Sequence, residues 1–179
     1  MKKFLKEALQ FSLILLAALL ISLFIVTYVG QRTVVDGESM ENTLYHGDNL
    51  IVDKISYRFN EPERFDVVVF PAHYDQKTYL VKRIIALPGE TIYIDDEGRI
   101  YIDDELLEED FGKEVIVSGG IASKPVTLGP DEYFVMGDNR NCSLDSRDYM
   151  VGNVKREELI GRAWVRIYPF DKMEFIKHD

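Results

Sequence analysis

The chain has 179 residues, 46% of them hydrophobic and 29% charged, which is an ordinary globular composition and enough for one domain with a proper core. The formal net charge is −10, and because the first ten residues carry +2, the remainder carries −12. An outer part this acidic is repelled by phosphate backbones, so we expect no nucleic-acid partner.

The N-terminal region contains an uncharged stretch of twenty residues, 11–30. That length spans the hydrocarbon core of a bilayer. A cleavable signal peptide would have a shorter apolar stretch, about 7 to 15 residues, followed by a small-x-small cleavage site. Residues 27–31 offer no such site. We therefore predict that residues 1–30 form a cytoplasmic N-terminus and a retained transmembrane anchor.

Charges on the two sides of this stretch predict its orientation. Lys2, Lys3 and Lys6 precede it, and only Arg32 follows soon after it. Because positive residues stay on the cytoplasmic side, we expect a single pass with a cytoplasmic N-terminus. Residues 31–179 would then form an extracytoplasmic domain.

Beyond the anchor, short β-type runs separated by turn residues predict a mainly β protein with antiparallel strands. The runs are residues 50–52, 66–70, 79–87, 91–94, 99–102, 115–117, 133–136 and 160–168. Short helical turns are expected at 39–44 and 155–159. Residues 92–102 read as a hairpin with an acidic turn at Gly98. Glycines and prolines then punctuate the chain, so 91–130 is predicted to be an inserted subdomain that lies away from the chemistry.

Nine acidic residues between positions 95 and 110 suggest a calcium site. Their spacing does not match the twelve-residue EF-hand loop, and a solvated, solubilising hairpin and loop explains them better. We therefore assign no metal and no cofactor.

Cys142 is the single cysteine, which excludes an intramolecular disulfide. No histidine stands near it in the sequence, so we interpret it as a buried, inert thiol. The three histidines, His46, His73 and His178, lie in turns or at the terminus and are interpreted as exposed bystanders.

Ser39 and Lys82 form the most informative pair of residues. Ser39 follows Gly37 after a short apolar stretch, so a turn can leave its hydroxyl exposed. In a strand, Lys82 would share an apolar face with Leu80 and Ile84, which disfavours its ammonium form. To be neutral near pH 7, its pKa must fall from about 10.4 to about 7, at a cost of roughly 4 kcal/mol, which buried lysines can reach. The adjacent Arg83 cannot serve as the base, because guanidinium does not deprotonate in proteins.

A dense polar block follows the strand at 133–136. It spans residues 136–148 and alternates acids with arginines. Such a block suggests a network of ion pairs that fixes the backbone. An exposed turn of the same composition is the alternative.

Four blocks in this order resemble the bacterial type I signal peptidases, the membrane-bound serine proteases of the serine–lysine type. The blocks are residues 37–44, 64–70, 79–90 and 137–152, and they cover most of the outer chain. The resemblance implies an antiparallel β catalytic core with a smaller inserted β subdomain, behind one anchor in the plasma membrane. It also implies that the chain removes N-terminal signal peptides from exported pre-proteins through an acyl-enzyme.

By the same resemblance, Ser39 is the nucleophile and Lys82 the general base. Ser143 matches the serine whose hydroxyl contacts and orients the lysine amine. The positions expected to hold the site through ion pairs are Asp138, Arg140, Asp145 and Arg147.

Two positions depart from the family pattern. Asn42 stands where proline is usual, which removes a restraint on φ, and we expect the change to be tolerated. Gly37 stands where some members carry a serine whose hydroxyl helps to bind the oxyanion. Backbone amides, that of Ser39 and one near Gly37, are expected to serve instead.

The resemblance implies substrates with an Ala-x-Ala-type site. The matching pocket positions are Val35, Asp36, Met40, Leu44, Leu80 and Val81, each of which could instead be a core residue. An extended substrate could pair its backbone with an exposed strand edge around Asp36 or Leu80. Membrane lipid is the second expected partner, and the side chains proposed to touch it are Phe59, Phe65, Trp164 and Phe170.

Two rival interpretations remain open. Self-cleaving repressors resemble the same serine–lysine fold, but they lack a membrane span, so residues 11–30 argue against this class. A tethered β module that binds a partner in the cell envelope would have no need of Lys82 on an apolar strand face. Cleavage assays of Ser39 and Lys82 variants separate an enzyme from such a module.

Overall fold

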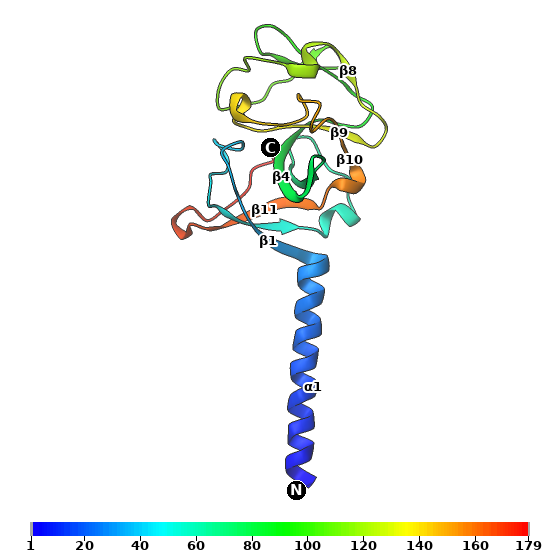
Figure 1. Cartoon of the computed structure of the whole chain (residues 1–179), viewed down its shortest axis with the longest axis vertical. Coiled ribbons are helices and arrows are strands. Elements are labelled where there is room, and N and C mark those ends of the chain that lie inside the picture. Colours follow the sequence, from blue (N-terminus) through cyan, green and yellow to red (C-terminus); the bar gives the residue numbers. More distant parts are fainter. Residues whose placement is uncertain (1, 179) are drawn as a thin grey trace.

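The structure, a computed structural model that describes residues 2–178, consists of one long helix and a β body (Figure 1). The helix α1 spans Lys2–Phe24 and continues as the short π-helical turn η1, Ile25–Val29. The segment Leu9–Val29 has a mean hydropathy of 2.7, and none of its most apolar window is buried inside the protein. This helix is long and apolar enough to cross a membrane, and such a surface is consistent with membrane anchoring.

The larger sheet is eight-stranded and antiparallel, with the order β1-β2-β11-β3-β4-β9-β10 and with β12 paired to β11. Its strands are β1 Gly30–Val34, β2 Asn49–Asp53, β3 Val67–Ala72, β4 Asp75–Ala86, β9 Glu132–Met136, β10 Val154–Lys155, β11 Gly161–Tyr168 and β12 Glu174–Phe175. Since β1 follows η1 directly, the apolar helix leads straight into one edge of this sheet.

A smaller, four-stranded antiparallel sheet lies at the end of the molecule opposite α1 (Figure 1). Its order is β7-β6-β5-β8, and its strands are β5 Thr91–Ile94, β6 Ile100–Ile102, β7 Glu105–Leu106 and β8 Val126–Thr127. Apolar residues of β5 and β6 pack against Phe134 and Met136 of β9, so the two sheets share one core cluster.

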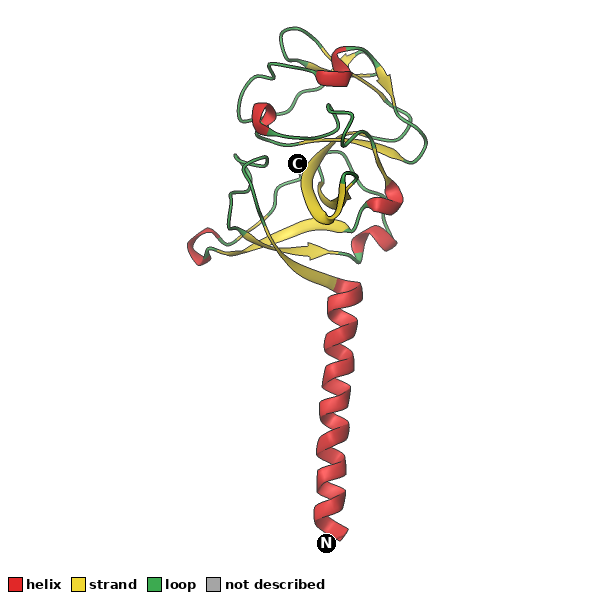
Figure 2. Cartoon of the chain, in the orientation of Figure 1, coloured by secondary structure: helices red, strands yellow, loops and turns green. Residues whose placement is uncertain are grey.

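Short 3₁₀ helices connect the strands (Figure 2). They are η2 Ser56–Arg58, η3 Gly120–Ser123, η4 Arg140–Cys142, η5 Arg156–Glu158 and η6 Phe170–Lys172. The predicted helical turn at 155–159 is confirmed by η5, and the one at 39–44 by the 2.8 Å hydrogen bond from Leu44 N to Met40 O.

The mainly antiparallel β class with one N-terminal apolar helix is confirmed, as is the hairpin, whose register pairs Ile92 with Ile102. The predicted strand at 115–117 is wrong. Its alternation is real, since Ile116 is buried while Val115 and Val117 are exposed. Yet its backbone pairs with the side chain of Asn141, at 2.9 Å for both Val117 N to Oδ1 and Nδ2 to Val115 O, instead of with a strand.

Two strand edges are open, one at β1 and one along β4 before Arg83. The strand β1 pairs only with β2. The strand β4 pairs with β3 over most of its length but with β9 only from Arg83 onward. Residues 79–82 therefore have one edge without a neighbouring strand, and this edge and the end of β1 line the same cleft.

Candidate active site

Ser39 lies in a tight turn between β1 and β2. The turn begins at Gly37, whose φ of +105° is strained for any residue with a side chain. It is closed by hydrogen bonds such as Glu41 N to Glu38 O, 3.1 Å. Met40 and Leu44 are buried in the core and fix the position of the turn, while Ser39 stays half-buried.

Lys82 lies on β4 and is 2% exposed. Its Nζ is 2.6 Å from Ser39 Oγ and 3.0 Å from Val81 O. Burial lowers the pKa of this amine from 10.5 to about 8, against the opposing effect of the Asp145 and Asp138 carboxylates. The direction is the one expected from the sequence, and the fall is smaller than expected.

Asp138 is paired with Arg83, a residue whose partner the sequence did not reveal. Both side chains are fully buried, and Arg83 Nε and Nη2 donate to the two carboxylate oxygens over 2.9 and 2.8 Å. Thr43, from the Ser39 turn, donates to Asp138 Oδ2 over 2.5 Å. The buried pair therefore connects β4, the loop after β9 and the turn that carries Ser39.

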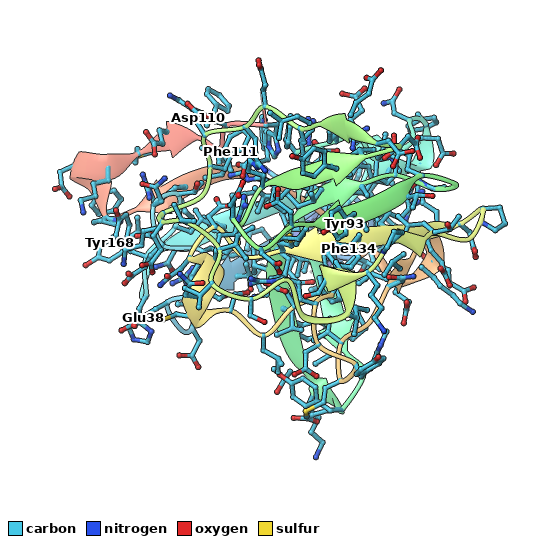
Figure 3. All side chains as sticks on the ribbon, turned by 90° about the horizontal axis from the view of Figure 1, so that it is seen from above. Glu38, Tyr93, Asp110, Phe111, Phe134 and Tyr168 are labelled. Atoms are coloured by element: carbon cyan, nitrogen blue, oxygen red, sulfur yellow. The ribbon has the colours of Figure 1, made fainter. Side chains whose placement is uncertain are left out.

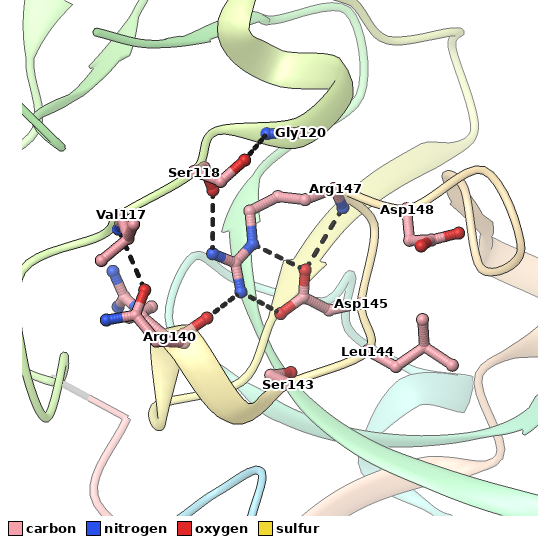
Figure 4. A pocket seen from close by; sticks show the side chains of 10 residues that line it. Val117, Ser118, Gly120, Arg140, Ser143, Leu144, Asp145, Arg147 and Asp148 are labelled. Atoms are coloured by element: carbon pink, nitrogen blue, oxygen red, sulfur yellow. Dashed lines mark hydrogen bonds and ion pairs between the residues drawn. The ribbon is translucent and has the colours of Figure 1, made fainter. Parts of the chain in front are cut away.

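The other expected network residues form separate pairs. Arg147 Nε and Nη2 each donate to Asp145 over 2.8 Å, next to a cavity of about 430 Å³ (Figure 4). Asp145 Oδ2 in turn accepts from Gly137 N over 3.0 Å. Arg140 pairs with Glu109, 2.7 Å away and in the inserted segment, so acids and arginines of the polar block do not all pair with each other.

Ser143 does not make the expected hydrogen bond to the Lys82 amine. Its buried Oγ has no hydrogen-bond partner among residues 2–178, because the amine contacts Ser39 and Val81 instead. Ser143 nevertheless lies close to the backbone of Ser39. A Cβ placed on Gly137 would lie 2.3 Å from both Ser143 Oγ and Ser39 O, so only glycine fits between them.

A cleft of about 300 Å³ opens beside Ser39 and Lys82. Its lining includes five of the six expected pocket residues, which are Val35, Asp36, Met40, Leu80 and Val81. Leu44, the sixth, is fully buried in the core cluster with Met40 and does not line the cleft.

The backbone amides near Ser39 differ in their availability. Gly37 N donates to His46 Nδ1 over 3.2 Å, so this amide already has a partner. Within the described part of the chain, Ser39 N donates to no protein group. It is therefore free to bind a negatively charged oxygen beside Ser39.

Two sequence interpretations need correction here. Cys142 is exposed, because η4 buries Arg140 and turns Cys142 outward. His178 is largely buried and accepts a hydrogen bond from Val67 N over 3.2 Å, since the C-terminal tail folds back onto β3. His73 pairs with Glu158 at 2.7 Å.

The chain matches the family described as signal peptidase, peptidase S26, over residues 8–168. It is 35% identical to the probable signal peptidase I-2 of Synechocystis sp., over 92% of this chain and 75% of the relative. It is 38% identical to the signal peptidase I of Leptolyngbya laminosa (87% and 77%) and 34% identical to the signal peptidase I U of Bacillus subtilis (98% and 95%). With a match over most of its length, the chain belongs to the signal peptidase family, peptidase S26.

Proposed function

We propose that this chain is a membrane-bound serine endopeptidase that removes signal peptides from exported pre-proteins, with Ser39 as nucleophile and Lys82 as general base. The observation that carries the proposal is the 2.6 Å distance between the buried Lys82 amine and the hydroxyl of the half-buried Ser39. A pKa near 8 leaves an appreciable part of the amine neutral at physiological pH. No histidine contacts either group within the described residues, so the base is an amine.

The reaction is an acyl transfer in two stages. The Ser39 hydroxyl donates to the neutral Lys82 amine and transfers its proton as Oγ attacks the scissile carbonyl. The ammonium then protonates the leaving amine, and an acyl-enzyme remains on Ser39. A water molecule gives its proton to the same amine and hydrolyses the ester, which restores the hydroxyl.

The developing oxyanion would be bound by Ser39 N. Gly37 has no hydroxyl to donate, and its own amide is held by His46. A single backbone donor aimed at the oxyanion is worth about 100- to 1,000-fold in rate. This chain would thus depend more on its turn geometry than relatives that add a serine hydroxyl.

The open edges of β1 and β4 suit an extended peptide, which could add as a strand between Asp36 and Leu80. Val35 and Met40 give the cleft an apolar wall, with Leu44 packed in the same core cluster. Such a wall could hold a small side chain such as a methyl group and exclude larger ones. We propose an Ala-x-Ala-type site on this basis.

The anchor would place the β body at the outer surface of the plasma membrane, with a cytoplasmic N-terminus and residues 31–179 outside. Signal peptides are cleaved at that surface, so the tether raises the local concentration of enzyme and substrate. Phe59, Trp164 and Phe170 are exposed and could contact lipid. Phe65 is half-buried against Phe111, with ring centroids 5.1 Å apart, and is not part of this proposal.

Replacing each member of the dyad tests the proposal. Ser39→Ala and Lys82→Ala should each reduce kcat on a synthetic signal-peptide substrate by at least about three orders of magnitude, as for residues that act as a unit. Ser123→Ala and Lys124→Ala, at exposed positions of the smaller sheet region, serve as matched controls and should retain activity. Undiminished cleavage by a folded dyad variant would reject the dyad.

A further inference from the structure

A short stretch between β7 and β8, residues 109–113, contacts the Ser39 turn, and we refer to it as the strap. Asn42 Nδ2 donates to Phe111 O over 3.1 Å, and Lys113 Nζ pairs with Glu41 Oε2 at 2.6 Å. Figure 3 labels Phe111 on this strap. The strap therefore contacts Glu41 and Asn42, the second and third residues after Ser39.

Phe111 covers the buried Arg83–Asp138 pair. The Arg83 guanidinium carbon lies 3.7 Å from the centroid of the Phe111 ring, and Phe65 packs on the same ring. All five guanidinium N–H groups are used, with bonds to Asp138 Oδ1 and Oδ2, Thr43 Oγ1, Phe65 O and Lys177 O. Because all its N–H groups are hydrogen-bonded and one face of its guanidinium lies against an aromatic ring, Arg83 is held in one position away from water.

The covered pair is connected to the nucleophile by short steps. Thr43, in the Ser39 turn, contacts both Arg83 and Asp138. The residue after Asp138, Asn139, holds the turn from the other side: its N–H donates to Ser39 O over 3.0 Å, and its Nδ2 donates to Glu38 O over 3.1 Å. Movement of the Arg83–Asp138 pair would therefore move both ends of the turn.

The strap is fixed to the same loop. Lys113 N donates to Asp138 O over 2.8 Å, and Arg140 pairs with Glu109. Phe111 N donates to Glu109 Oε2 over 2.9 Å, so Phe111 is connected to the Arg140–Glu109 ion pair. The strap is thus attached both to the turn that carries Ser39 and to the loop after β9, which together support Ser39.

We infer that Phe111 is a positioning residue for Ser39, acting through the Arg83–Asp138 pair, and that the inserted segment takes part in catalysis through this strap. The inference replaces the expectation that the insertion lies away from the chemistry. It rests on the assignment of Ser39 as nucleophile. Phe111 touches neither reacting group, so its effect is on the placement of the hydroxyl relative to the Lys82 amine.

The test compares Phe111→Ala with Phe111→Tyr in the full-length chain. A displaced nucleophile loses rate more than binding, so Phe111→Ala should lower kcat about 10- to 100-fold while KM changes less than about 3-fold. Phe111→Tyr keeps the aromatic face and should restore kcat to within about 2-fold of the parent. Val117→Ala, at an 84% exposed apolar position of the same segment, is the control and should leave kcat unchanged.

Thermal unfolding of each variant separates positioning from stability. Phe111→Ala should lower kcat at temperatures at which the variant is fully folded. An unchanged kcat in folded Phe111→Ala, or an equal loss in Phe111→Tyr, would overturn the inference. If Ser39→Ala retained activity, the proposed function itself would fail, and this result is distinguishable from failure of the strap alone.

Discussion

Burying the amine of Lys82 costs folding free energy. Its pKa falls from 10.5 to about 8 in the folded chain, so the folded state binds the proton less tightly than the unfolded state. The penalty is fully present below pH 8 and disappears as the pH rises through 10.5. A pKa difference of this size is worth about 3 kcal/mol.

Lys82→Met should therefore stabilise the protein at pH 7 while abolishing activity. We expect a gain of about 1 to 3 kcal/mol in the free energy of unfolding, because the lost bonds to Ser39 and Val81 offset part of the penalty. The gain should shrink between pH 8 and pH 10.5, where the parent chain becomes more stable. Denaturant unfolding at several pH values measures it, with exposed Lys124→Met as control, and a variant less stable than the parent at pH 7 would contradict this linkage.

At the residue level, the local sequence pattern predicted the burial of Lys82 but not the Arg83–Asp138 ion pair. The alternation of Leu80, Lys82 and Ile84 predicts a lysine on an apolar face, and the structure buries it. Arg83 looks from the sequence like an ordinary neighbour. Its pairing with Asp138 depends on the register of β4 against β9, which brings together residues 55 positions apart, and no local signal reports such a contact.

At the level of elements, the turn that carries Ser39 has a conformation that its sequence explains. Asn42 has a φ of +98°, in the left-handed region that asparagine tolerates better than most residues. Proline is fixed near −65° and cannot adopt this angle. Asparagine in place of the family proline therefore suits the backbone conformation of this turn. The Asn42 side chain also donates a hydrogen bond to the strap.

Asn42→Pro, which restores the family pattern, should impair the protein instead of improving it. We expect a loss of about 1 to 3 kcal/mol in stability and at least a 10-fold fall in kcat, because the turn must change its path. Asn42→Gly tolerates the φ and removes only the side-chain bond to Phe111 O, so it should keep more activity. Parallel measurements of kcat and Tm compare the two variants, and a fully active Asn42→Pro would show that the turn is not held in this shape.

Elements with a strong apolar pattern were predictable and polar ones were not. Strands β2, β5, β9 and β11 lie close to their predicted runs. The strand β1 was missed, because Gly30–Val34 is short, mostly polar and exposed, and it is formed by pairing with β2 and not by its own burial. The strands β7, β8, β10 and β12 have two residues each, too few for any periodicity.

At the scale of the whole molecule, the anchor and the β body are nearly independent. The helix projects from one edge of the larger sheet and buries none of its most apolar window against the body (Figure 1). Contacts near the junction include the 3.4 Å bond from Lys54 Nζ to Val26 O and Arg58 over the Tyr28 ring at 5.0 Å. The apolar helix therefore does not determine the shape of the site.

Removing residues 1–29 should separate these two roles. The shortened chain should cleave a short soluble peptide with a kcat/KM within about 3-fold of the full chain, because the cleft does not involve α1. On a pre-protein embedded in lipid vesicles, its rate should fall by about 100-fold or more as the shared tether is lost. Equal losses on both substrates would mean that the helix supports the folded site.

The measurement that tests the central claim most directly is the pH dependence of kcat/KM for the full-length protein on a synthetic signal-peptide substrate. If a neutral Lys82 amine removes the Ser39 proton, the rate rises with pH along a limb with an apparent pKa of about 8 and then levels. A limb near 10.4, the value of a solvated lysine, would contradict the account, because the amine would then not be desolvated beside the hydroxyl.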